Sequence, residues 1–120
     1  MSDVDNWTPL HLNHAEQVEM DAFDELEEAR MDEVRAYGTP LIERAAARTA
    51  DALAAHARAL DACVAQWDRF LPWFKLLAPE KAEDLEDFTQ FQRELRIQKR
   101  KCLLELDSRN VPRPDGIEFD

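Results

Sequence analysis

Glycine is almost absent from this chain of 120 residues, which contains only Gly38 and Gly116. Loops that cradle phosphates need several glycines at fixed spacing, so the sequence excludes the P-loop and the dinucleotide-binding fingerprint. Serine is as scarce: Ser2 and Ser108 are the only ones, and neither has the setting of a nucleophile elbow. The chain therefore carries no motif of a nucleotide-binding protein or a serine hydrolase.

Long apolar runs are also missing. No run approaches the roughly 18 residues of a membrane span, and no charged-then-apolar signal opens the chain, so we expect a cytoplasmic protein with no membrane contact. Cysteine is limited to Cys63 and Cys102, both on predicted apolar helix faces. This placement favours reduced, buried thiols in a reducing compartment, with a bridge between the two as the alternative.

Histidines in metal-binding patterns are scarce. Helical di-iron proteins need a glutamate three residues before a histidine, and none of the three histidines here has one. His11 and His14 are three residues apart and could bind a transition metal with Glu16 or an N-terminal aspartate, although surface or capping histidines give the same spacing. We therefore expect no enzyme, no catalytic residue, no metal and no cofactor, and keep a metal-binding helical protein as the second alternative.

The strongest pattern in the sequence is the helical spacing of its apolar residues. In the segment 40–71, apolar or small residues recur at alternating steps of four and three, a heptad pattern that predicts one long helix. The positions are Ile42, Ala46, Thr49, Leu53, His56, Leu60, Cys63, Trp67 and Phe70. Thr-Pro pairs at residues 8–9 and 39–40 predict two helix starts. Gly38 predicts the end of the first helix, and Pro72 predicts an end or a sharp kink of the second.

Two further helices are expected on either side of this one, over residues 9–37 and 79–107. On the first, we predict a buried stripe of Ala15, Val18, Ala22, Leu26, Ala29 and Tyr37. On the third, the stripe is Leu85, Phe88, Phe91, Leu95, Cys102 and Leu106. Short connections imply an up-down-up order, which would set the acidic second half of the first helix near the basic stretch 93–101 of the third.

The predicted fold is thus all-α: an elongated three-helix bundle with a long central helix that dimerises into a larger helical bundle. We expect a flexible N-terminus (1–8), a three-helix domain (9–106) and an extended or mobile C-terminal tail (107–120). In that tail, Ile117 and Phe119 could instead dock on the bundle. The aromatic-rich stretch 67–77 is expected to plug the bundle end, with an anchor for a partner as the alternative.

The negative charge is concentrated at one end of the chain. The net charge is −11, and residues 1–33 hold eleven acidic residues and one basic residue. One face of the first helix forms an acidic ridge of Asp21, Asp24, Glu25, Glu28 and Asp32. We interpret the ridge as a solvated face or, alternatively, as an acidic nucleic-acid mimic that inhibits a nucleic-acid-binding protein. The basic stretch 93–101 is weak evidence for direct nucleic-acid binding, which we do not expect.

Two polar residues interrupt the central heptad pattern. Thr49 and His56 lie at core positions, where a polar layer fixes helix register or pairing. For His56, a pH-dependent switch is the alternative, because histidine changes charge near neutral pH.

The functional hypothesis comes from apolar residues outside the expected core stripes. Such surplus apolar surface usually marks a contact with another protein. The residues are Met20, Phe23, Met31 and Val34 on the first helix and Ile97 and Leu104 on the third. We therefore predict a non-catalytic protein–protein interaction module, an adaptor, inhibitor or assembly factor that acts as a homodimer. Its eleven arginines against four lysines suggest a bacterial or bacteriophage origin.

Overall fold

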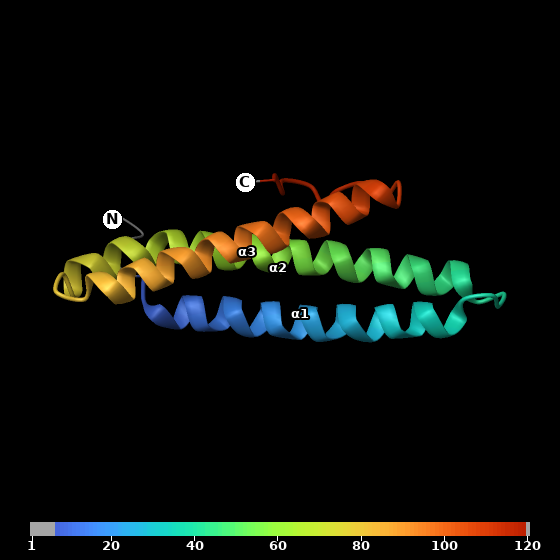
Figure 1. The fold of residues 1–120 in the computed structure, drawn as a ribbon, viewed down its shortest axis with the longest axis horizontal. Helices are drawn as coiled ribbons and strands as arrows, with labels where there is room; N and C mark the ends of the chain where they lie inside the picture. Colours follow the sequence, from blue (N-terminus) through green and yellow to red (C-terminus); the bar gives the residue numbers. More distant parts are fainter. Residues whose placement is uncertain (1–6, 120) are drawn as a thin grey trace.

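The computed structural model describes residues 7–119, and these form three helices and no strand. The helices are α1 (Pro9–Ala36), α2 (Ile42–Leu77) and α3 (Ala82–Ser108). The molecule measures 58 × 31 × 22 Å, with α2 along most of its length (Figure 1). The all-α class, the up-down-up order and the elongated shape predicted from the periodicity are confirmed. No helix in the described part of the chain is both long and apolar enough to cross a bilayer.

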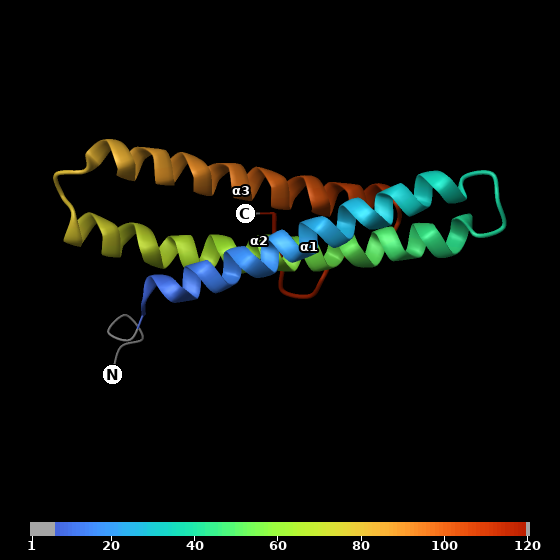
Figure 2. The ribbon, with the colours of Figure 1, turned by 90° about the horizontal axis from the view of Figure 1, so that it is seen from below.

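The central helix holds the other two together. α2 packs against both α1 and α3, whereas α1 and α3 make few contacts with each other. In Figure 1 α1 lies along one side of α2 while α3 runs across α2, and in the view of Figure 2 α1 crosses α2 so that its C-terminal end approaches that of α3. The three helices therefore form an open arrangement in which α1 and α3 each keep a wide outer face.

The first helix begins and ends where the sequence indicates. Thr8 is the N-cap with Pro9 at the first helical position, and the Thr8 backbone N–H donates to His11 Nδ1 at 3.3 Å. His11 is thus a capping histidine. The helix ends at Ala36, and Gly38 follows with φ +79°, a left-handed conformation that glycine adopts at little cost.

The predicted boundaries of α2 and α3 need correction. α2 starts at Ile42 rather than Pro40, and α3 starts at Ala82 rather than residue 79. More importantly, α2 does not end at residue 71 but continues through Pro72 to Leu77. Pro72 removes one backbone hydrogen bond, but its ring lies on the exposed side of the helix. Aromatic contacts on the other side hold both halves in line.

Those contacts form a cluster at the α2–α3 end of the molecule. Phe70 packs against Trp67, Trp73, Phe74 and Phe88, with ring centroids 5.1–5.8 Å apart. The expectation that this stretch plugs the bundle end agrees with this packing. Trp7 joins the cluster from outside the helices and is itself buried. The N-terminal segment was predicted to be flexible up to residue 8, but Trp7 is held in place, and residues 1–6 lie outside the described part.

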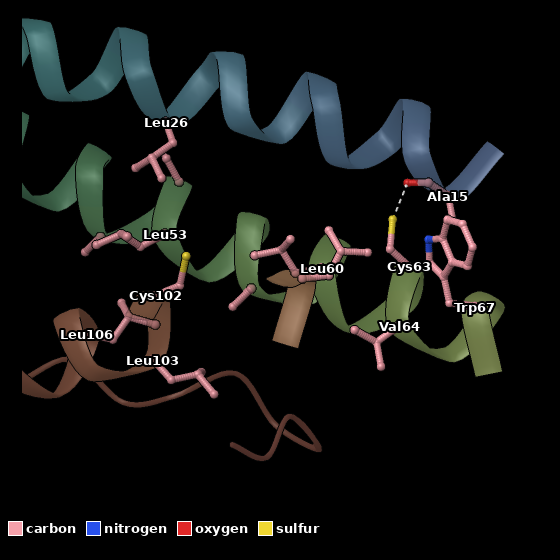
Figure 3. Close-up of a cluster of buried hydrophobic side chains, with 14 of the residues drawn as sticks. Ala15, Leu26, Leu53, Leu60, Cys63, Val64, Trp67, Cys102, Leu103 and Leu106 are labelled. Atoms are coloured by element: carbon pink, nitrogen blue, oxygen red, sulfur yellow. Dashed lines mark hydrogen bonds between the residues drawn. The ribbon is translucent and has the colours of Figure 1, made fainter. Parts of the chain in front are cut away.

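The core follows the heptad pattern of α2. Leu53, Leu60, Cys63 and Trp67 are all buried between the flanking helices (Figure 3). Both cysteines are free, so the alternative of a disulfide is wrong. In α1, small residues such as Ala29 are fully buried, which allows α1 and α2 to approach closely.

Three predicted core residues are exposed instead: Val18 on α1, Phe91 on α3 and Tyr37, which follows α1. Val18 and Phe91 lie at the margin of their stripes, and in an open three-helix arrangement each outer helix has only α2 to cover it. The buried strip is correspondingly narrow, so residues at its edge reach solvent. Tyr37 lies just beyond the end of α1, where the chain leaves the bundle.

The C-terminal tail returns to the helices. Val111, Ile117 and Phe119 are partly buried against the core, and the guanidinium of Arg113 lies 3.9 Å from the centre of the Phe119 ring. The docking of Ile117 and Phe119 is therefore the arrangement in the structure.

The ion pairs between α1 and α3 differ from those expected. Arg30 pairs with Glu105 at 2.7 Å, and Arg109 pairs with Glu33 at 2.9 Å. Within the basic stretch of α3, Arg96 and Lys99 pair with residues of α2 and not with α1. The predicted contact of the acidic part of α1 with this stretch is wrong: Arg96 and Lys99 are turned toward α2, and Arg93, Arg100 and Lys101 are exposed, with no ion pair to α1 among the described residues.

Candidate functional site

The six apolar residues proposed as a contact surface are all exposed. Their exposed fractions range from 44% for Phe23 to 76% for Val34. Those on α1 define an α1 apolar stripe: Met20, Phe23, Met31 and Val34. Those on α3 define an α3 outer face: Ile97 and Leu104. Phe23 is the residue of the stripe closest to the core, since its ring lies 5.7 Å from that of His56.

The structure does not bring these two surfaces together. At about 100° of rotation per residue, Ile97 and Leu104 lie roughly opposite the buried Lys99 and Leu106, so they point away from α2. Met20 and Met31 lie about 120–140° from the buried Leu26 and also point mostly away from α2. The stripe and the outer face therefore lie on different helices, and each is turned mostly away from α2.

The acidic ridge is partly occupied by a cation from α2. Arg48 donates to Glu25 at 2.9 Å, pairs closely with Asp32, and lies 3.8 Å from Glu28. The pKa of Arg48 is raised above its ordinary value, chiefly by the hydrogen bond to Glu25. Asp21 accepts a hydrogen bond from Gln17, and Asp24 is exposed. The ridge thus serves in part as an intramolecular contact between α1 and α2.

The polar layer predicted from Thr49 and His56 is buried. Thr49 is fully buried, and its hydroxyl lies within hydrogen-bond distance of the Ala45 and Ala29 carbonyls. His56 is bonded through both nitrogens: Nε2 lies 2.9 Å from a Glu19 carboxylate oxygen, and Nδ1 lies 3.6 Å from Cys102 Sγ. A neutral imidazole protonated on Nε2 satisfies both contacts, since it donates to the carboxylate and accepts from the thiol.

The order thiol, imidazole, carboxylate matches that of a cysteine nucleophile with its base and orienting acid. Here the thiol is unsuited to that chemistry. Burial, with a contribution from Glu105, raises the pKa of Cys102 to about 11, and the side chain is buried. Burial likewise raises the pKa of Cys63 to about 12, and its thiol donates to the Ala15 carbonyl at 3.1 Å (Figure 3). Protonated, enclosed thiols are poor nucleophiles, so the chain Cys102–His56–Glu19 acts as a buried polar layer.

The histidine pair gains no further metal ligands from the fold. Across residues 7–119, no group of three or more His, Cys, Asp or Glu side chains is arranged to hold a metal ion. His11 is engaged with Thr8, and His14 is exposed.

Two charged groups, Glu19, which is half-buried, and Lys99, which is buried, are absent from the sequence-based site predictions. Glu19 completes the polar layer, and Lys99 is 1% exposed with its amine 3.1 Å from Asp61. Glu19 has a signal in the sequence: it lies four residues after Ala15 and three before Ala22, within the apolar stripe of α1. Lys99 has a similar signal, since it falls between Leu95 and Cys102 on the core face of α3.

Comparison of the chain with protein-family models, with curated proteins and with solved structures gives no match in any of the three.

Proposed function

We propose that this protein is a non-catalytic helical module that binds other proteins as an adaptor, inhibitor or assembly factor. It also self-associates, and the dimer is its smallest assembly. The observation that carries the proposal is the α1 apolar stripe. Four large apolar side chains lie on one side of α1, and each is at least 44% exposed. Exposed apolar surface of this kind marks contact sites, and methionines suit an adaptable one.

The buried chemistry supports the same conclusion. The thiols are enclosed and have raised pKa values, and His56 uses both ring nitrogens to bridge α1 and α3. These groups stabilise the pairing of the three helices. The surfaces on the outside are then the part of the molecule that can act on a partner.

The acidic mimic is the second proposal, and the position of Arg48 counts against it. A decoy for a phosphate-binding channel must present its carboxylates freely, whereas Arg48 engages three of the five ridge residues. Under this alternative, the protein would compete with DNA for a basic nucleic-acid-binding protein, and salt would weaken the complex steeply.

The proposed self-association is tested by light scattering on three proteins: the wild type, Met31→Asp and the control Leu76→Asp. Met31 belongs to the stripe and is 55% exposed, whereas Leu76 is an exposed apolar residue at the far end of α2. We expect Met31→Asp to weaken self-association by about tenfold or more, because it places a charge in the contact. Leu76→Asp should associate as the wild type does. Equal behaviour of the two variants would contradict the role of the stripe.

A further inference from the structure

The α1 apolar stripe and the α3 outer face differ in the charges that surround them. Glu27 lies within the stripe, four residues from both Phe23 and Met31, and Asp24 borders it. The α3 outer face is bordered by Arg93 and Lys101, with Lys101 between Ile97 and Leu104 in the sequence. The stripe thus has Glu27 and Asp24 along it, with Arg30 and Arg35 beside Met31 and Val34, whereas the α3 outer face is bordered by cations.

The difference extends over the helices that carry these surfaces. α1 contains nine acidic residues and two arginines. The second half of α3, residues 93–104, contains five basic residues and one glutamate. Two copies of α1 placed side by side would bring carboxylates together, and two copies of α3 would bring cations together. Contact between α1 of one copy and α3 of another pairs opposite charges.

We infer that copies of this chain associate head to tail, with the α1 apolar stripe of one copy packed against the α3 outer face of the next. This inference rests on the proposed self-association and specifies its geometry. The two surfaces lie on different helices and each points mostly away from α2, so one such contact uses one surface of each copy and leaves its other surface open. Such a contact is heterologous and leads to rings or filaments rather than to a closed two-fold dimer.

Sequence spacing gives this contact a register. Glu27 lies midway between Phe23 and Met31, and Lys101 lies four residues after Ile97 and three before Leu104. With the helices parallel or antiparallel, pairing the apolar residues places Glu27 opposite Lys101. Both side chains are exposed, and neither forms an ion pair among residues 7–119.

The experiment uses two full-length variants, each with one damaged surface. Met31→Asp damages the stripe and leaves the α3 outer face intact, and Leu104→Asp does the reverse. Each variant alone should be monomeric by sedimentation velocity. An equimolar mixture should form a 1:1 complex of twice the 13.9 kDa monomer mass and nothing larger, because each complex then has only one usable contact.

Charge exchange provides the second measurement and avoids any question of folding, since both residues are exposed. Glu27→Lys and Lys101→Glu should each weaken association by about fivefold or more, and the double variant should restore it. Circular dichroism checks that every variant keeps its helix content.

Other outcomes separate the inference from the proposed function. If Met31→Asp is monomeric while Leu104→Asp self-associates like the wild type, the protein pairs through α1 alone: head-to-tail contact is overturned and self-association stands. If the wild type is itself monomeric, both are overturned. If the double charge variant is no better than the single ones, the Glu27–Lys101 register is wrong.

Discussion

At the scale of single residues, the most unusual feature is a lysine in the core. Lys99 is 1% exposed and its amine is 3.1 Å from Asp61, a residue that itself reaches solvent. Removing a charge from water costs several kcal/mol unless the charge is paired. The stability of this region therefore depends more on the carboxylate of Asp61 than on Lys99 itself.

The two members of this pair should respond differently to replacement. Asp61→Asn leaves the buried ammonium without its counter-charge and should lower the free energy of unfolding by about 1–3 kcal/mol. Lys99→Met keeps the length of the side chain and removes the charge, so we expect a change below about 1 kcal/mol. Urea denaturation of both variants checks this, and a larger loss for Lys99→Met than for Asp61→Asn would contradict the account.

Residue-level prediction from the sequence was good where periodicity applied. Thr49 and His56 were placed in the core because they fall on the heptad positions of α2, and both are buried. The partners of His56 could not be predicted, because the register of α1 and α3 against α2 depends on packing between helices and not on the sequence of α2. Glu19 and Lys99 interrupt the apolar stripes of α1 and α3 in the same way as His56 interrupts the heptad pattern of α2. A search for polar residues at apolar positions of the two outer helices would therefore have found both.

At the scale of elements, the helices were predictable, but three of their ends were not, and the largest error is the end of α2. Thr8, Pro9 and Gly38 act locally, so the limits of α1 follow from the sequence. Whether α2 ends at Pro72 or continues through it depends on long-range contacts, because Phe88 of α3 packs against Phe70 and Phe74 on either side of the proline. A local rule cannot include those contacts.

Replacing this proline should stabilise α2. Pro72→Ala supplies an N–H to the helix and removes a ring that is exposed, while the aromatic cluster is unchanged. We expect the free energy of unfolding to rise by about 1 kcal/mol or more, measured by urea denaturation. A loss of stability in this variant would indicate that the proline shapes the packing at the bundle end.

The ends of α1 and α3 are joined by charge, and this link should weaken in acid. The pKa of Glu105 is lowered by hydrogen bonds from Arg30, and that of Glu33 by hydrogen bonds from Arg109. Because both folded-state pKa values lie below the ordinary value of 4.5, the two pairs contribute fully above that pH. Their contribution is lost as the pH falls through the lowered values.

The double variant Glu33→Gln/Glu105→Gln measures how much these two ion pairs contribute to the free energy of unfolding. Between pH 7 and pH 3 the wild type should lose more stability than the variant, by about 1 kcal/mol in all because the pairs are partly exposed. Thermal or urea unfolding at several pH values measures the difference. Parallel pH profiles for the two proteins would show that these ion pairs contribute nothing to stability.

At the scale of the whole molecule, the arrangement of helices explains why apolar surface remains outside. α2 is the only helix with neighbours on two sides, whereas α1 and α3 contact little besides α2. Each outer helix can bury a single narrow stripe, so Met20 and Met31 on one and Ile97 and Leu104 on the other stay in solvent. The sequence indicated this surplus because three helices cannot cover both sides of two outer members. It could not indicate how the two surfaces lie relative to each other, because that depends on the packing of α1 and α3 against α2.

The central claim is that this surface is occupied by another copy of the chain. The most direct measurement is sedimentation velocity of the wild-type protein over a dilution series from about 1 µM to about 200 µM. We predict a mass that rises with concentration above that of the 13.9 kDa monomer. A mass that stays at 13.9 kDa over the whole series would contradict the account.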